Sequence, residues 1–196
     1  MGDWFQTYVD TEATAEDAPR LAGNVRDWLI SESVIAAERQ DDCVLGWGPG
    51  YPPGKRYADI TEDRDPGLLS LSTNGLRLEA GRSVFFNGGS DPSAATCPHC
   101  RQTTVLVDRG WQLIPEKWAL FQDAVHSWDT DDDEPVACPS CGRAARVDTW
   151  GWADDSIVFG HLGFTFWNWP TLRHAFELEL TKRLDGHRTV LLAGKL

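Results

Sequence analysis

The sequence predicts an α+β fold, and three observations support this class. Each end of the chain alternates a β-rich run, an amphipathic helix and a second apolar run. A segment rich in glycine and proline, residues 44–67, follows the first of these units and indicates long loops. Four of the five cysteines occur as two Cys-x-x-Cys pairs in the middle of the chain, which indicates a separate module there.

The N-terminal part of the chain reads as strand, helix, strand. Residues 4–9 are mostly aromatic and β-branched, and such residues favour a strand. Pro19 suits the first turn of the helix that follows. The apolar run at 34–37 predicts the next strand. The predicted helix carries one apolar stripe, which consists of Leu21, Val25, Trp28 and Leu29.

The C-terminal part repeats this order. We expect a strand over residues 162–169, which Pro170 ends, and a helix that begins at Thr171 and stops at Gly186. The last strand is predicted over 188–193. Two β-α-β units of this kind predict a ferredoxin-like scaffold, in which helices cover one face of a four-stranded sheet.

The domain organisation follows from what lies between the two β-α-β units. Two short apolar runs, 76–80 and 83–86, are expected to form a hairpin joined through Gly81. A polar linker then leads to the cysteine pairs. We expect three parts: residues 1–93 as an N-terminal half with a long loop and hairpin, residues 94–150 as an inserted module, and residues 151–196 as the C-terminal half that completes the scaffold.

The two cysteine pairs are the most specific chemical signal in the chain. They read Cys-Pro-His-Cys (97–100) and Cys-Pro-Ser-Cys-Gly (138–142). Each CxxC turn directs two thiolates toward one point, and two such turns supply the tetrahedral sulfur set that Zn²⁺ prefers. Gly142 suits the positive φ that such a turn needs, whereas Arg101 stands in this place in the first turn. The predicted ligands are Cys97, Cys100, Cys138 and Cys141.

This CPxC…CPxCG pattern resembles the knuckle pair of zinc-ribbon and rubredoxin-type proteins, over about residues 94–150. The resemblance implies a metal–thiolate fold element and no particular activity. A structural Zn²⁺ is favoured, because four thiolates leave no position for water or substrate. A rubredoxin-type iron site and a dithiol–disulfide pair remain as alternatives, and His99 is an alternative ligand. Cys43, which has no partner by count, is expected to be a small buried apolar residue.

The long stretch between the two cysteine pairs predicts further structure inside the module. Pro115 suits the start of a helix that extends to Trp128 and carries apolar residues on one face. We expect strands at 103–107 and 144–149 to lead away from the first pair and the second pair, respectively.

The charge of the chain limits the classes of partner. The formal net charge is −12, which repels a phosphate backbone and favours solubility or a basic partner. We therefore expect a protein partner with a basic surface, while nucleic acid is disfavoured. The candidate contact residues are an acidic run and two residues of the 48–56 loop: Asp129, Asp131, Asp132, Asp133, Glu134, Tyr51 and Lys55.

Two pairs of tryptophans are spaced so that each pair shares one face of a strand. Stacked indoles can form a platform for sugar rings or unstacked bases. Packing in a hydrophobic core is the other interpretation. The candidate residues are Trp150, Trp152, Trp167 and Trp169.

Catalysis has little support in the sequence, so no catalytic residue is predicted. The chain contains no GxSxG or HExxH motif, and Lys55 in its glycine-rich stretch lacks the Ser or Thr of a phosphate-binding loop. No apolar run is long enough to span a membrane, and the N-terminus does not resemble a signal peptide. We expect a non-enzymatic cytoplasmic binding, adaptor or inhibitor-type protein with a structural zinc. A nucleic-acid-binding zinc-ribbon module and an enzyme with a small-molecule pocket are the alternatives.

Overall fold

The computed structural model describes residues 2–46, 48–88, 91–130 and 134–196. The protein is a mixed α/β chain with antiparallel sheets, and it divides into two compact units. Met1–Gly81 and Gly160–Leu196 form the first, which we call the end unit. Arg82–Phe159 form the second, which we call the middle unit.

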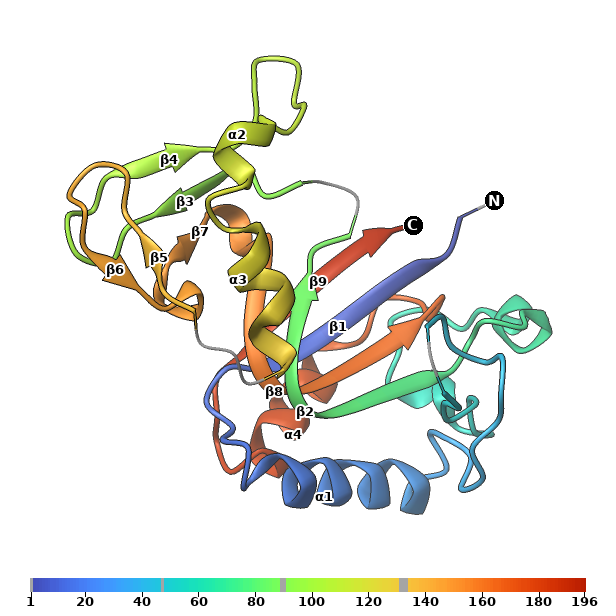
Figure 1. Cartoon of the computed structure of the whole chain (residues 1–196). Helices are drawn as coiled ribbons and strands as arrows, with labels where there is room; N and C mark the ends of the chain where they lie inside the picture. Colours follow the sequence, from blue (N-terminus) through green and yellow to red (C-terminus); the bar gives the residue numbers. More distant parts are fainter. Residues whose placement is uncertain (1, 47, 89–90, 131–133) are drawn as a thin grey trace. The chain divides into compact units, whose positions relative to one another are not determined.

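The end unit is built on a four-stranded sheet with the strand order β2-β8-β1-β9 (Figure 1). The central strand β1 (Trp4–Asp10) is antiparallel to both β8 (Ile157–Trp167) and β9 (Thr189–Lys195). The strand β2 (Leu76–Phe86) lies on the other side of β8. The two ends of the chain therefore meet as neighbouring strands β1 and β9.

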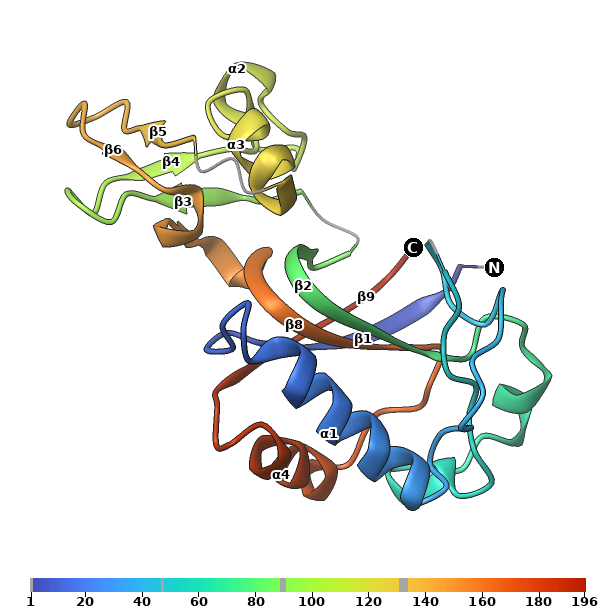
Figure 2. The same cartoon turned by 60° about the horizontal axis from the view of Figure 1, so that its bottom comes forward.

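Two helices cover one face of this sheet, α1 (Ala18–Ser31) and α4 (His174–Arg183) (Figure 2). The ring of Trp28 on α1 stacks on that of Phe176 on α4, with centroids 5.6 Å apart and an interplanar angle of 13°. The expected apolar stripe of α1 faces the strands: Leu21, Val25 and Leu29 belong to one buried cluster, and the half-buried Trp28 packs against it. That cluster includes Leu21, Val25, Leu29, Leu180 and Leu184 from the helices and Tyr8, Phe164 and Phe166 from the sheet.

The second strand of the N-terminal half is β2, and the strand expected at 34–37 is wrong. Ile35 makes a single β-bridge, to Pro53. Beside this bridge the N–H of Ala36 donates to the carbonyl of Pro52 at 2.8 Å. Pro52 has no N–H to donate back, so this pairing does not extend into a ladder. The hairpin expected at Gly81 is also wrong, since β2 continues through this glycine as one strand.

The helix α4 starts at His174, later than the expected Thr171. Leu172 forms a β-bridge with Thr61, so the chain is still extended at this point. The expected end is confirmed, because Gly186 follows the last turn with a φ of +86°.

The middle unit contains two small antiparallel sheets. The strands β3 (Ala94–Thr96), β4 (Thr103–Val105) and β7 (Gly151–Trp152) form the first sheet, in the order β4-β3-β7. The strands β5 (Val136–Ala137) and β6 (Ala144–Ala145) form the second. The strands expected at 103–107 and 144–149 are therefore shorter than predicted. Short 3₁₀ turns occur at Tyr57–Asp59, Pro66–Ser70, Trp128–Thr130, Val147–Thr149 and Ala153–Asp155.

The single helix expected from Pro115 to Trp128 is divided into α2 (Pro115–Trp118) and α3 (Gln122–Ser127). The N–H of Phe121 donates to the carbonyl of Trp118 at 2.8 Å, which tightens the chain between the two helices. This turn brings the Phe121 ring into the core of the middle unit, where it is fully buried.

The described helices are short. The longest, α1, has 14 residues, and none of the described helices combines the length and the apolar character that crossing a lipid bilayer requires.

Candidate metal centre

The first cysteine pair forms the turn between β3 and β4. The N–H of Cys97 donates to the carbonyl of Gln102 at 3.0 Å, and the N–H of Arg101 donates back to the carbonyl of Cys97 at 3.1 Å. The N–H of His99 points at the sulfur of Cys97, 3.4 Å away. Arg101 closes the turn with a φ of +60°.

The second pair forms the turn between β5 and β6 and repeats the same bonds. The N–H of Cys138 donates to the carbonyl of Arg143 at 2.9 Å, and the N–H of Gly142 donates to the carbonyl of Cys138 at 2.9 Å. The N–H of Ser140 points at the sulfur of Cys138, 3.4 Å away. Gly142 has a φ of +70°, as its position requires. The two cysteine pairs are thus two copies of one turn.

The two turns bring four sulfur atoms together. The Sγ atoms of Cys97, Cys100, Cys138 and Cys141 all lie within 4.8 Å of one another, and none is in a disulfide. Cys100 and Cys138 are 3.7 Å apart between sulfurs. A Zn–S bond of about 2.3 Å gives a tetrahedral sulfur–sulfur edge of about 3.8 Å. The donor set therefore fits a four-coordinate metal ion of this size.

The surroundings of the sulfurs change the proton affinity of two thiols. Burial raises the pKa of the Cys138 thiol, but the N–H groups of Cys141 and Ser140 and the neighbouring thiols lower it more, to about 6. The N–H of Gln102 lowers the pKa of the Cys100 thiol, whereas burial and the other thiols raise it to about 11. A cation held at the centre would favour the thiolate form at all four positions.

His99 does not complete the sulfur cluster. Its Nε2 lies 3.1 Å from the carbonyl oxygen of Ala144 on β6, so the ring connects the first turn to the hairpin that carries the second. The four sulfurs alone could hold a metal ion, without this imidazole.

No family model matches the chain, and comparisons with curated proteins and with solved structures returned no match. The class of this molecule therefore rests on its own geometry. It is a mixed α/β protein with a four-cysteine cluster that can hold a metal ion.

The four candidate platform tryptophans are all buried. Trp150 and Trp152 belong to the core of the middle unit, and Trp169 belongs to that of the end unit. Trp167 is 7% exposed and packs on Phe5 with ring centroids 5.7 Å apart. Their role is core packing, and they offer no exposed platform.

The candidate partner residues fall into three groups. Asp129, Glu134 and Lys55 are exposed. Tyr51 is 9% exposed and belongs to the core of the end unit, so its ring is not a contact surface and this part of the prediction is wrong. The remaining acids of the predicted run, Asp131, Asp132 and Asp133, lie outside the described residues.

Cys43 is a buried residue, as expected. It is 4% exposed, and its thiol donates to the carbonyl of Gln40 at 3.3 Å. Burial raises the pKa of this thiol. Its sulfur also packs where Gly75 has no side chain, since a Cβ there would lie 2.6 Å from it. A thiol in this setting is inert rather than nucleophilic.

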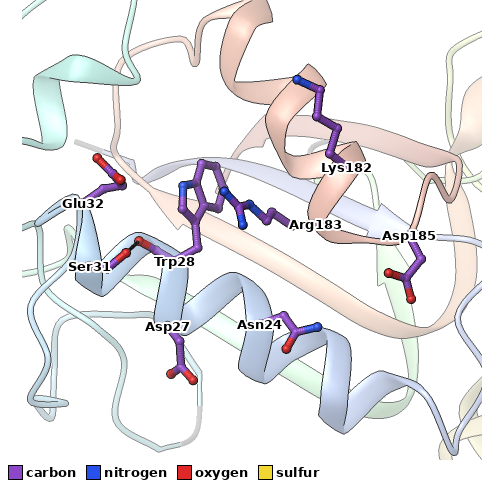
Figure 3. A pocket seen from close by; sticks show the side chains of 8 residues that line it. All are labelled: Asn24, Asp27, Trp28, Ser31, Glu32, Lys182, Arg183 and Asp185. Atoms are coloured by element: carbon purple, nitrogen blue, oxygen red, sulfur yellow. Dashed lines mark hydrogen bonds between the residues drawn. The ribbon is translucent and has the colours of Figure 1, made fainter.

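A groove of about 560 Å³ lies between α1 and α4 (Figure 3). Trp28 forms part of its wall, and the guanidinium of Arg183 lies 5.3 Å from the ring centroid. The charges at its rim are already paired: Arg183 with Glu179 at 3.1 Å, and Asp185 with Arg20 at 2.9 Å.

The sequence patterns did not indicate one pair of hydrogen-bonded side chains, Asp10 and His187. Asp10 at the end of β1 is fully buried and accepts hydrogen bonds from the N–H groups of Glu12 and Ala13 and from Nδ1 of His187 at 2.9 Å. The pair is far apart in sequence, and only the pairing of β1 with β9 brings it together. The sequence signal for this pair is positional. The acid comes directly after the predicted first strand, and the histidine comes directly before the predicted last strand.

Proposed function

We propose that the middle unit is a zinc-binding module of the zinc-ribbon kind, inserted into a ferredoxin-like end unit. The two matching hairpin turns support the first part. The order of elements β1-α1-β2 and β8-α4-β9, with both helices on one face of the sheet, supports the second. In this proposal the insertion occupies the connection between β2 and β8.

Zn²⁺ is the metal we propose, in a structural role. Four thiolates in a tetrahedral set suit zinc or a single iron. The proposed role of the site is to hold together two hairpins that lack a large core of their own. Zinc is favoured because this role requires no redox chemistry. None of the five cysteines forms a disulfide, which fits a reducing compartment, so we place the protein in the cytoplasm.

We propose that the protein is a non-enzymatic binding protein whose middle unit engages a protein partner with a basic surface. The observation that carries this proposal is a set of exposed acids without partners. Asp123, Asp129 and Glu134 are exposed, and within the described part of the chain no cation lies in ion-pair contact with them. In the end unit, the exposed Asp27 and the half-buried Glu179 are paired with arginine. Its exposed acids Glu16, Asp41 and Asp42 have no ion-pair partner within the described residues, so they offer a matched comparison.

The unpaired acids of the middle unit would act by electrostatic steering of a basic partner. Like charges close together raise the local negative potential, which attracts a basic surface and accelerates encounter. Because these acids are exposed, salt screens their effect, with a Debye length of about 8 Å at physiological ionic strength. Binding should therefore weaken markedly as salt is added.

The test begins with affinity capture on the zinc-loaded protein. The captured partner is then produced in recombinant form, and its affinity for the zinc-loaded protein is measured. The triple variant Asp123→Asn/Asp129→Asn/Glu134→Gln should weaken binding by at least about tenfold and flatten the salt dependence. A matched control in the end unit, Glu16→Gln/Asp41→Asn/Asp42→Asn, removes the same charge and should bind as the wild type. A partner that binds both variants equally would contradict the proposal.

A second candidate function has one specific observation in its favour. Trp111 in the middle unit is 75% exposed, with the exposed Arg109 two positions before it. An exposed indole beside a guanidinium can stack on a base while the cation meets a phosphate. Quenching of tryptophan fluorescence by an oligothymidylate, with a steep loss between about 50 and 200 mM salt, would favour this function. Unchanged fluorescence in wild type, or the same quenching in Trp111→Ala, would count against it.

A further inference from the structure

The strand β9 is an edge of the four-stranded sheet, since the order β2-β8-β1-β9 gives it a partner on one side only (Figure 1). An edge strand presents unpaired N–H and C=O groups that can pair with another chain. β9 spans seven residues, Thr189–Lys195, in unbroken register with β1. It contains no proline or bulge that would prevent pairing.

The hydrogen bonds at its two ends show which residues of β9 face the free side. The N–H of Leu196 donates to the carbonyl of Asp3 at 2.9 Å. The N–H of Thr11 donates to the carbonyl of Arg188 at 3.2 Å. In an antiparallel ladder, the N–H and C=O of one residue point the same way and alternate residues point to opposite sides. Even-numbered residues therefore face β1, and the free side carries the backbone groups of Thr189, Leu191, Ala193 and Lys195.

The side chains along this edge are unusually apolar for an open strand. Leu191 is 45% exposed, and Leu196 just beyond the strand is 62% exposed. Natural sheets protect such edges with charged side chains. β9 carries one charged side chain, that of Lys195 at its end. On the adjacent helix α4, Leu178 is 53% exposed and stands two positions after Phe176, which packs on α1. Leu178 therefore lies on the side of α4 that faces away from α1.

We propose that β9 pairs with β9 of a second copy of this chain, in antiparallel orientation, to form a continuous eight-stranded sheet in a symmetric dimer. Pairing centred on Leu192 sets Leu191 opposite Ala193 of the second copy, and Thr189 opposite its Lys195. No like charges then face each other across the new ladder. The four outward residues of each strand meet as hydrogen-bonded pairs, so the free backbone groups of both strands are satisfied.

A second copy suits this edge because the contact is self-complementary. The same residues are used by both chains, and the two-fold axis closes the assembly at two copies. A strand from another protein would need its own match in length and register. The dimer also covers the exposed Leu191 in both chains. This inference does not depend on the proposed function, since it concerns the end unit alone.

The test is the oligomeric state of the full, zinc-loaded chain, measured by sedimentation equilibrium from about 1 to about 200 μM. Wild type should dimerise within this range. Ala193→Pro removes one outward N–H, which the monomer does not use, and should raise the dissociation constant at least tenfold. Leu191→Lys brings a cation close to Lys195 of the second copy and should also raise the dissociation constant.

The control for the lysine variant is Leu69→Lys, which changes a leucine that is 58% exposed and belongs to no strand. It should leave the dissociation constant unchanged. Residue-resolved amide exchange adds a measurement that does not depend on a variant. In dilute protein the amides of Leu191 and Ala193 should exchange quickly, and protection should appear as the dimer forms. A wild type that stays monomeric, a dimer unaffected by both β9 variants, or a dimer in which these two amides stay unprotected would overturn the proposal.

Discussion

Arg101 and Gly142 hold equivalent positions in the two cysteine turns, and their backbones have nearly the same φ, +60° and +70°. Glycine adopts this conformation at no steric cost, whereas a residue with a Cβ loses about 1–2 kcal/mol. The Arg101 side chain is exposed, and within the described residues it has no ion-pair partner that could offset this cost. The first turn is therefore the more strained of the two.

Replacing Arg101 with glycine should stabilise the metal-loaded protein. Relief of the left-handed backbone gains about 1–2 kcal/mol, and the greater freedom of glycine in the unfolded chain costs about 0.4–1 kcal/mol. The net gain is about 1 kcal/mol in the free energy of unfolding, measured by denaturant titration at constant free zinc. Gly142→Ala should lose about as much by the same reasoning. If both variants move the stability in one direction, the strain argument fails.

The Asp10–His187 pair should make stability depend on pH. The hydrogen bond to Asp10 raises the pKa of His187 above its ordinary value of 6.5, and nearby acids add to this. The folded protein thus holds this proton more tightly than the unfolded chain does. The contribution is complete below pH 6.5 and is lost as the pH rises through the raised pKa.

We therefore expect the difference in unfolding free energy between wild type and His187→Gln to be largest near pH 6 and to shrink in alkaline solution. Urea titrations across this range measure it. Asp10→Asn provides the control, because its side-chain oxygen still accepts from the N–H groups of Glu12 and Ala13 but no longer pairs with the imidazolium. A gap between wild type and His187→Gln that does not change with pH would show that the contact contributes by packing alone.

At the level of elements, the sequence predicts best where one physical signal acts alone. The apolar stripes of α1 and α4 follow helical spacing, and burial of Leu21 and Leu180 confirms them. The run at 34–37 fails because strand propensity says nothing about which segment supplies the partner. There, Ile35 meets a proline-rich loop, while the distant β2 takes the place beside β8.

The four-cysteine cluster was predictable because CxxC spacing is a local property of the chain. Its surroundings were not. The contact from His99 to the carbonyl of Ala144 joins two hairpins that are separated by α2 and α3, and no local pattern indicates it. The same holds for the Phe121 turn, where burial of one ring divides a regular helical pattern. Long-range packing overrides propensity at both places.

The two hairpins of the middle unit should depend on the metal. The strands of the first hairpin, β3 and β4, have three residues each, and those of the second, β5 and β6, have two each. This is too little pairing to persist in water without support. Cys97→Ser should abolish metal binding and the near-ultraviolet circular dichroism of the middle-unit tryptophans. Cys43→Ser is the matched control, since this buried cysteine lies in the end unit, and it should keep the metal. Metal content by mass spectrometry reports both; a full metal load in Cys97→Ser would remove this cysteine from the ligand set.

At the scale of the whole molecule, the two units have separate hydrophobic cores. One buried cluster draws all its members from the end unit, and the other draws all its members from the middle unit. The four cysteines that form the cluster lie in the middle unit. Metal binding therefore stabilises the middle unit directly. In small peptides, binding of a structural zinc contributes about 10–16 kcal/mol. The other unit rests on its sheet and helices.

Removing the metal should consequently unfold one unit and spare the other. After a strong chelator is added to the wild-type protein, backbone amides of β3, β4, α3 and β7 should lose their protection against hydrogen exchange, as the two hairpins and the core around Phe121 open. Amides of β1, α1 and α4 should keep their protection, because the contacts among these elements contain no metal ligand. Restoring zinc in excess over the chelator should recover the pattern. If protection is lost throughout the chain at once, the two cores unfold as one cooperative body, and the metal stabilises the whole fold.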